Sequence, residues 1–452
     1  MKKLLLIVLL IPLISFTQEE EEKKFGITFS GFVKTDIFFD SRQTVDARDG
    51  QFLLYPKNEM LDDNGDDINA GLKFNMLSIQ TRLKGTITGP DVLGAKLSGV
   101  IEGAFFGNIG TDINGFRLRH AFVKLDWEYA EPKGSLGTEL LVGQYWHPMF
   151  VTSCFPGTVN FNTGTPFQPF ARNPQIRINQ KLGKFNLIAT ALTQVDFVST
   201  GPDGLSTKYM INSGIPEMNF RAEFNSETFL AGAGVNYKNI QPRLYVESAN
   251  VYNPDGTTLK TDELAGGTSF FAYVKLNTKP LTVKLYGVYG QMMYSMTMLG
   301  GYAEKEVVKE VYTPSDTIIG WPPIVPVTKT TNINYTPIGT ASGWIDIHTN
   351  GKRWQFGLFS GYTKNLGSND LIEYQNAIQG AGGTQVYYSR GNNIAYVYRI
   401  SPRVIYNVGK FRIAPEIDYT VAAYGSPDEK GVVQNAKEIG NFRFLLGVYF
   451  FF

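Results

Sequence analysis

Arginine and lysine side chains recur at alternate positions of short segments in which apolar residues occupy the other positions. "TRLKGTI" contains Arg82 and Lys84, "AFVKLDW" contains Lys124, "QIRINQ" contains Arg177 and "NFRAEF" contains Arg221. Because successive side chains of a strand point to opposite faces, these cations would share one face of a sheet. Cationic side chains around an aqueous space lower the barrier to anions. The pattern therefore predicts an anion-binding passage that these five residues line.

The same face also carries carboxylates, although basic positions outnumber acidic ones. The basic positions are Lys34, Arg82, Lys84, Lys96, Lys124, Arg177, Arg221, Lys275, Lys284, Arg353, Arg399, Arg403, Arg412 and Arg443. The acidic positions are Asp36, Glu102, Asp126, Glu223, Asp346, Glu416 and Asp418. Two interpretations stay open: solvated charges that select anions, or ion pairs that only stiffen a wall.

Catalytic chemistry is not predicted. The three histidines, His120, His147 and His348, are far apart and lack the spacing of metal ligands. Ser153 follows His147 by six residues, but a hydroxyl nucleophile also needs a base and an orienting group within hydrogen-bond reach. The sequence predicts no enzyme, no metal site and no cofactor.

Sixteen alternating segments could position the charged side chains. The predicted strands are 26–40, 74–87, 95–107, 116–129, 139–150, 174–182, 184–197, 217–224, 228–238, 268–278, 281–293, 342–349, 352–364, 393–408, 411–425 and 441–452. Short turns alternate with long loops, and both ends of the chain lie on the short-turn side. The sequence therefore predicts an all-β fold, a transmembrane antiparallel β-barrel of sixteen strands, wide enough for a channel. A neighbouring even number of strands stays open, and Pro402 and Pro415 predict bulges or strand ends.

The two ends of the chain indicate export to a membrane. "MKKLLLIVLLIPLISF" begins with lysines, and its apolar run is shorter than the ~20 residues of a membrane-spanning helix. It predicts a signal peptide at 1–17, followed by a short acidic segment at 18–25 and a barrel at 26–452. The final segment, "NFRFLLGVYFFF", alternates with one wholly apolar face, which we expect to meet lipid.

Composition excludes several other classes of protein. The single cysteine, Cys154, excludes a disulfide framework. Of the 42 lysines and arginines, two lie in the predicted signal peptide, so 40 face 41 acidic residues in the mature chain. This near-neutral balance predicts no nucleic-acid partner.

The loop at 151–174 differs from an exposed loop tip because it carries Phe155, Phe161, Phe167 and Phe170. Aromatic side chains in a loop need a surface on which to pack. We expect the loop to fold into the barrel, narrow the passage and present Arg172; a loop at a subunit interface is the alternative. The apolar loop at 294–340 predicts a lid, a latch on a neighbouring subunit or a partner site.

Three motifs resemble one family of barrels. "FRLRHAFVKL", "LVGQYWHPMF" and "FARNPQIRI" resemble the corresponding stretch of DcaP-like trimeric porins, in the divergent form found in Bacteroidetes. The resemblance covers 116–178 and implies a sixteen-stranded trimer, an inward third loop and uptake of small, often carboxylated anions. It implies constriction residues Arg117, Arg119, Gln144, His147, Arg172 and Arg177. Strict alternation places Arg117 and Arg119 opposite Lys124, which predicts a bulge or an interface role, and the long loops at 41–70 and 294–340 depart from the family pattern.

The function that these observations predict is passive diffusion of small hydrophilic solutes, favouring anions such as small carboxylates, through a porin of the bacterial outer membrane. The expected partners are outer-membrane lipid, two further copies in a homotrimer, and the barrel assembly machinery, which would recognise the strand ending at Phe452. The alternative is a closed or loop-capped barrel that serves as a structural, adhesion or secretion-accessory platform.

Overall fold

The computed structural model describes residues 25–106, 114–130, 135–250, 253–312, 327–375 and 384–452. The predicted signal peptide and almost all of the acidic segment lie outside these residues. Within the described residues, no helix is both long and apolar enough to cross a membrane.

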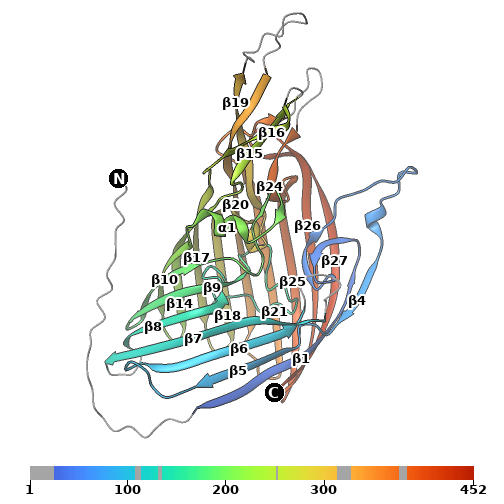
Figure 1. Ribbon diagram of the computed structural model, residues 1–452. Helices are drawn as coiled ribbons and strands as arrows, with labels where there is room; N and C mark the ends of the chain where they lie inside the picture. Colours follow the sequence, from blue (N-terminus) through green and yellow to red (C-terminus); the bar gives the residue numbers. More distant parts are fainter. Residues whose placement is uncertain (1–24, 107–113, 131–134, 251–252, 313–326, 376–383) are drawn as a thin grey trace, which may run out of the picture.

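Sixteen antiparallel strands form the barrel (Figure 1), which confirms the predicted fold class and strand number. They are β1 (Gly26–Asp40), β4 (Lys73–Leu77) continued by β5 (Arg82–Thr88), β6 (Lys96–Phe105), β7 (Phe116–Ala130), β8 (Leu136–Trp146), β9 (Arg172–Leu182), β10 (Phe185–Leu192), β13 (Glu217–Asn225), β14 (Phe229–Ile240), β17 (Ala265–Asn277), β18 (Leu281–Gln291), β20 (Val327–Thr349), β21 (Trp354–Gly367), β25 (Ile394–Val408), β26 (Phe411–Pro427) and β27 (Val433–Phe451). β1 closes the barrel by pairing with β27, from Phe32 opposite Phe451 to Asp40 opposite Arg443.

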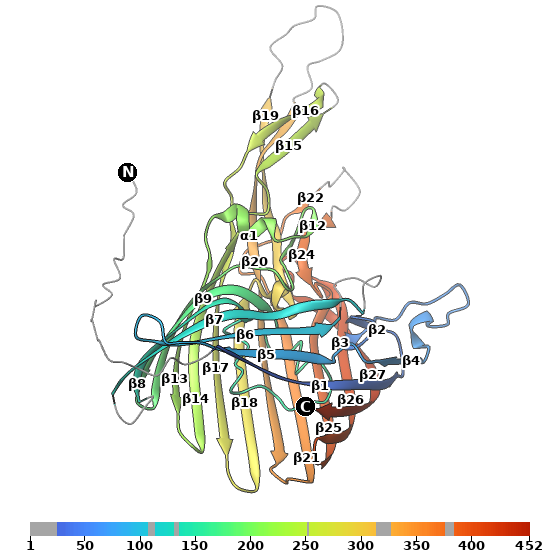
Figure 2. The same cartoon turned by 60° about the horizontal axis from the view of Figure 1, so that its bottom comes forward.

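Shorter elements lie in the loops. They are β2 (Thr44–Ala47), β3 (Phe52–Pro56), η1 (Ile68–Ala70), β11 (Thr200–Gly201), β12 (Gly204–Leu205), α1 (Lys208–Ser213), β15 (Tyr245–Asn250), β16 (Asn253–Lys260), η3 (Met293–Met296), β19 (Gly300–Tyr312), β22 (Tyr374–Gln375), β23 (Thr384–Gln385) and β24 (Tyr387–Arg390). β19 pairs with the first half of β20, and this ribbon and the β15–β16 hairpin project beyond the barrel rim (Figure 2). The predicted loop at 294–340 is therefore largely strand, and most of its apolar stretch at 318–327 lies outside the described residues.

The strands alternate as period-2 patterning predicts. Phe29, Ile101, Phe220, Phe270 and Phe442 lie on the outer face and are exposed. An apolar outer surface of this kind is what the hydrocarbon core of a bilayer requires of a barrel. The apolar face predicted for the last strand accordingly points outward.

The bulges or strand ends expected at Pro402 and Pro415 are not found, so this prediction was wrong. Both residues lie inside long strands, and the register of β25 with β26 is the same on either side of them. Proline has no N–H to donate to a neighbouring strand. Here the strands continue, with Pro402 opposite Leu358 of β21 and Pro415 opposite Leu446 of β27.

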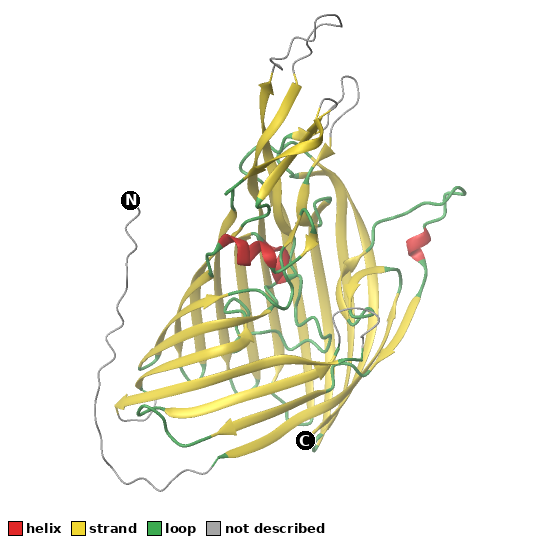
Figure 3. Ribbon diagram, in the orientation of Figure 1, coloured by secondary structure: helices red, strands yellow, loops and turns green. Residues whose placement is uncertain are grey.

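The lumen is crossed by the loop between β8 and β9, residues 147–171, which we call the constriction loop. The backbone N–H groups of Val159 and Asn160 donate to Glu416 of β26, each at 2.8 Å. β26 is the fifteenth strand of the barrel, whereas the loop leaves from the fifth, so the loop reaches the opposite wall. The predicted inward fold of this loop is confirmed, and Figure 3 shows loop segments inside the barrel.

An apolar core lies inside the lumen. Phe161, Phe167 and Phe170 of the constriction loop are buried in it with Phe52 of the β2–β3 hairpin and Met293 of η3. Barrel interiors are usually polar and filled by side chains, by water or by a plug. In this protein three loops supply the filling, and they narrow the passage.

Candidate functional site in the barrel lumen

Five arginines gather beside the wall formed by β5 to β9: Arg48, Arg82, Arg117, Arg119 and Arg172. We call them the arginine cluster. Four of them surround the ring of Phe106, with guanidinium carbons 4.1 Å (Arg48), 5.8 Å (Arg117), 5.4 Å (Arg119) and 5.7 Å (Arg172) from its centroid. Arg48 comes from the turn between β2 and β3, and the others come from strands of the wall.

Two carboxylates neutralise part of the arginine cluster. Asp196 accepts from Arg172 at 2.7 Å and from Arg117 at 2.6 Å, and Arg48 lies 3.7 Å from it. Glu102 lies 2.7 Å from Nε of Arg119 and 3.4 Å from Nε of Arg82. Five cations thus face two anions, which leaves an excess of three positive charges.

A β-bulge in β7 explains how Arg117 and Arg119 reach the lumen. Glu102 of β6 lies opposite His120, but the next residue, Gly103, lies opposite Leu118. Arg119 is therefore the extra residue, and it shifts the alternation by one position. A bulge was one of the two explanations that the sequence offered for the positions of Arg117 and Arg119, and it is confirmed.

The charge state of Asp196 follows from its neighbours. Burial opposes its ionisation, but the charges of Arg172, Arg48 and Arg117 outweigh burial and hold the pKa of the carboxyl group below its usual range. Asp196 is thus a carboxylate at neutral pH, and it joins the β10–β13 loop to two strands and to the β2–β3 turn.

Replacing Asp196 with asparagine should lower the free energy of unfolding at pH 7 by about 2 kcal/mol, because charged hydrogen-bond partners are lost. The pKa of the Asp196 carboxyl group is lower in the folded protein than its value of about 3.9 in the unfolded chain. Its ionised form therefore stabilises the fold at pH values above about 3.9, and this stabilisation is lost as the pH falls through the folded-state pKa. The difference between wild type and Asp196→Asn should therefore be full above about pH 5 and shrink below about pH 4. Urea unfolding in lipid vesicles at several pH values measures it, and a difference independent of pH would contradict the assignment.

The remaining predicted site residues lie elsewhere on the wall. Gln144 donates to the carbonyl of Arg119 at 3.0 Å, and Lys124 pairs with Glu139 at 3.1 Å. His147 lies 3.0 Å from Glu217. Arg177 donates to the carbonyl of Trp146 at 2.8 Å, Arg221 donates to that of Pro148 at 3.0 Å, and Lys84 has no ion pair among the described residues. The structure thus brings together Arg82, Arg117, Arg119 and Arg172, with Gln144 beside them, and separates the others; their roles in solute binding stay predictions.

Sequence reasoning missed Arg48 and Asp196. Arg48 lies in a polar loop whose inward fold no periodicity indicates, and Asp196 was placed in a predicted strand. β10 in fact ends at Leu192. The sequence did contain a signal for this strand end. Thr193 and Gln194 are adjacent polar residues, and they break the alternation of apolar and polar positions.

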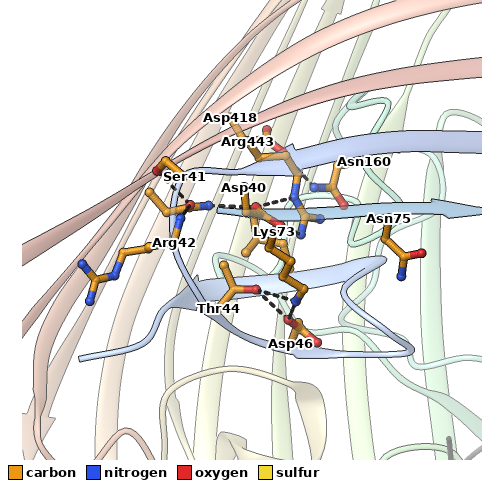
Figure 4. Close-up of polar contacts among 12 residues, drawn as sticks. Asp40, Ser41, Arg42, Thr44, Asp46, Lys73, Asn75, Asn160, Asp418 and Arg443 are labelled. Atoms are coloured by element: carbon orange, nitrogen blue, oxygen red, sulfur yellow. Dashed lines mark hydrogen bonds and ion pairs between the residues drawn. The ribbon is translucent and has the colours of Figure 1, made fainter. Parts of the chain in front are cut away.

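Many charged side chains of the barrel wall donate hydrogen bonds to loops or form ion pairs with one another. Lys34 donates to the carbonyl of Val159 and Lys284 donates to that of Phe155, both at 2.9 Å. Arg443 pairs with Asp40 at 2.7 Å, beside Asn160 and Asp418 in Figure 4. For Lys34, Asp40 and Arg443 the structure favours the interpretation of charges that stiffen the wall.

A cavity of about 220 Å³ opens on the short-turn side of the constriction loop. Its charged and titratable lining residues are Lys284, His348, Arg403 and Arg412, and none of its lining residues is acidic. Arg403 pairs with Asp346 at 2.8 Å, whereas Lys284 and Arg412 have no ion pair within the described part of the chain. We call this space the basic vestibule.

In the described ranges, no group of three or more His, Cys, Asp or Glu side chains could hold a metal ion.

Comparison with known proteins identifies the architecture. No family model and no curated protein matches the chain. The outer-membrane channel DcaP of Acinetobacter baumannii has a similar structure, with a TM-score of 0.61, 16% identity and coverage of 97% of this chain and 100% of that chain. The fold is that of an outer-membrane porin.

Two further porin-type structures are similar at lower scores. An anion-selective porin from Comamonas acidovorans has a TM-score of 0.51 and 10% identity over 95% of this chain and all of that chain. In-vitro folded OmpT of Vibrio cholerae has a TM-score of 0.50 and 10% identity over 96% of this chain and 99% of that chain. The predicted resemblance to DcaP-like porins is confirmed in the fold, and the apolar outer face places this porin-type barrel in the bacterial outer membrane.

Proposed function

We propose that this protein is an outer-membrane channel that admits small hydrophilic solutes by passive diffusion and favours anions, small carboxylates among them. The basic vestibule carries the proposal. Lys284 and Arg412 are partly exposed there without acidic ion-pair partners among the described residues, and a cationic wall raises the local concentration of anions. The fold of the Comamonas porin, which is described as anion-selective, supports the same proposal.

The proposed partners follow from the outer face. We expect a homotrimer, as the resemblance implies, and an apolar groove lined by Phe25, Ile101, Val123 and Val142 is a surface that a neighbouring subunit could cover. The barrel assembly machinery would recognise the last strand, whose Phe452 exchanges backbone hydrogen bonds of 3.2 Å with Gly31. We expect no enzymatic activity and no cofactor.

A second candidate is the closed or loop-capped platform, favoured by the apolar core inside the lumen. Phe52, Phe161 and Phe167 are almost fully buried there, as in the core of a soluble domain. In this case the barrel would display its loops at the cell surface without conducting.

Recordings from purified protein in a planar bilayer under a KCl gradient separate the two candidates. We expect a steady conductance, in triplets if the trimer forms, with a reversal potential that favours chloride. In the Lys284→Gln/Arg412→Gln variant, the reversal potential should move toward zero because the vestibule loses two charges. Arg42→Gln is the matched control, since Arg42 pairs with Asp67 in the β1–β4 loop, away from the vestibule.

If protein that is shown to be folded and inserted does not conduct, the channel proposal is wrong and the platform is favoured. An unchanged reversal potential in the double variant would remove the vestibule as the source of selectivity.

A further inference from the structure

Buried cations in the arginine cluster keep unused hydrogen-bond donors. Nη1 of Arg48, of Arg119 and of Arg172 is buried and has no hydrogen-bond partner within the described residues. The three side chains are 6%, 1% and 0% exposed. An unpaired charged donor that has lost its water is among the costliest groups to bury, so a partner for these three N–H groups is to be expected.

The three guanidinium groups share their surroundings. All three lie within 5.7 Å of the centroid of Phe106. Arg119 and Arg172 also lie 5.7 Å and 5.4 Å from the ring of Trp146, and Arg48 and Arg172 approach the same carboxylate, Asp196. One small ligand could therefore contact more than one of them.

We propose that the arginine cluster holds a resident oxyanion of the sulfate or phosphate class between Arg48, Arg119 and Arg172. A guanidinium group presents paired N–H donors that match two oxygens of such an ion, whereas chloride is a single atom and offers no such pair. A divalent oxyanion would offset most of the three excess positive charges. The inference goes beyond the proposed channel, because it concerns an anion that stays bound rather than one that passes.

A bound anion would also stabilise the charged form of Arg48, which burial disfavours. Burial lowers the pKa of Arg48 to about 9, with Asp196 opposing the shift and Arg172 and Arg117 adding to it. Arg48 belongs to the β2–β3 turn, whereas Arg119 and Arg172 belong to the wall. An oxyanion between them would therefore fasten the β2–β3 hairpin into the lumen.

Thermal unfolding of the purified, full-length barrel in detergent tests the proposal. After exhaustive dialysis against chloride to remove the bound oxyanion, sulfate or phosphate added at matched ionic strength should raise the unfolding midpoint until it saturates, as for binding to one site. In Arg48→Gln, the anion concentration at half-saturation should increase by about tenfold or more, since one charge-assisted pair is lost. Arg42→Gln, in the same loop but paired with Asp67, should respond as wild type does.

Sulfate and phosphate also stabilise proteins by exclusion from their surface, an effect that increases without saturation. An unsaturated rise, or the same rise in Arg48→Gln, would show an adventitious ion only and overturn the proposal. If Arg48→Gln does not fold, equilibrium dialysis of wild type with radiolabelled sulfate decides: one ion per chain supports the site, and none overturns it. Neither assay measures conduction, so failure of the channel proposal would be seen separately.

Discussion

The Arg399→Met variant should weaken the attachment of two inward loops at once. Arg399 of β25 donates to the carbonyl of Thr165 at 2.9 Å in the constriction loop, and to those of Leu54 at 2.8 Å and Leu53 at 3.3 Å in the β2–β3 hairpin. The carbonyl of Leu53 keeps Asn162 as a donor at 2.6 Å, so two buried carbonyls are left without one. Each costs about 1–3 kcal/mol, so we expect the free energy of unfolding to fall by at least about 2 kcal/mol. Urea unfolding in lipid vesicles, followed by tryptophan fluorescence, measures the loss.

The matched control is Arg353→Met. Arg353 is exposed near a short turn and donates to the hydroxyl of Tyr406, so its replacement should change the free energy of unfolding by no more than about 0.5 kcal/mol. Equal losses in the two variants would show that Arg399 does not hold the loops. In a conducting protein, Arg399→Met should also enlarge the single-channel conductance, because two loops that narrow the lumen lose one of their attachments to the wall.

The Asp40→Ala variant should weaken the seam at which the barrel closes. Asp40 of β1 accepts from Nε of Arg443 at 2.8 Å and from its Nη2 at 2.7 Å, across the pairing of β1 with β27 (Figure 4). Both side chains are 0% exposed. Removing one partner of a buried pair leaves the other charge uncompensated, which costs about 3–5 kcal/mol.

Glu59→Ala provides the comparison, since its pair with Lys437 is exposed and such pairs contribute about 0–1 kcal/mol. Unheated and heated samples on a denaturing gel report the closed barrel by its mobility. Asp40→Ala should lose the compact form at a lower temperature or urea concentration than Glu59→Ala does. The same unfolding profile for both variants would argue against a stabilising role of the seam.

The strands could be predicted because the pattern that specifies each strand lies within its own segment of the sequence. A period-2 pattern is repeated within each segment, and each of the sixteen predicted segments overlaps a strand of the barrel. The ends of the strands were less predictable. β20 begins at Val327 rather than at 342, because it continues as a ribbon with β19, a pairing that its own sequence does not specify.

Only the residues of the candidate site that lie on strands of the barrel wall could be predicted from the sequence. Arg82 follows from the register of its strand, whereas the inward position of Arg119 depends on a bulge whose location strict alternation does not specify. Arg48 and Asp196 enter the cluster from loops, and the direction of a loop depends on packing across the lumen rather than on local pattern. The four phenylalanines of the constriction loop were an exception, because so much apolar surface needs an interior.

The length of β20 determines what the cell displays. Its 23 residues, at about 3.3 Å each, extend for roughly 75 Å, whereas a strand that crosses a bilayer needs only about 9–11 residues. The part paired with β19 thus stands clear of the lipid, on the side of the long loops. An antibody or a bacteriophage approaching the cell would touch this ribbon before it reached the mouth of the barrel. Substitutions at residues 305–309 and 330–334 can therefore change the surface that such agents recognise while leaving the membrane-embedded wall as it is.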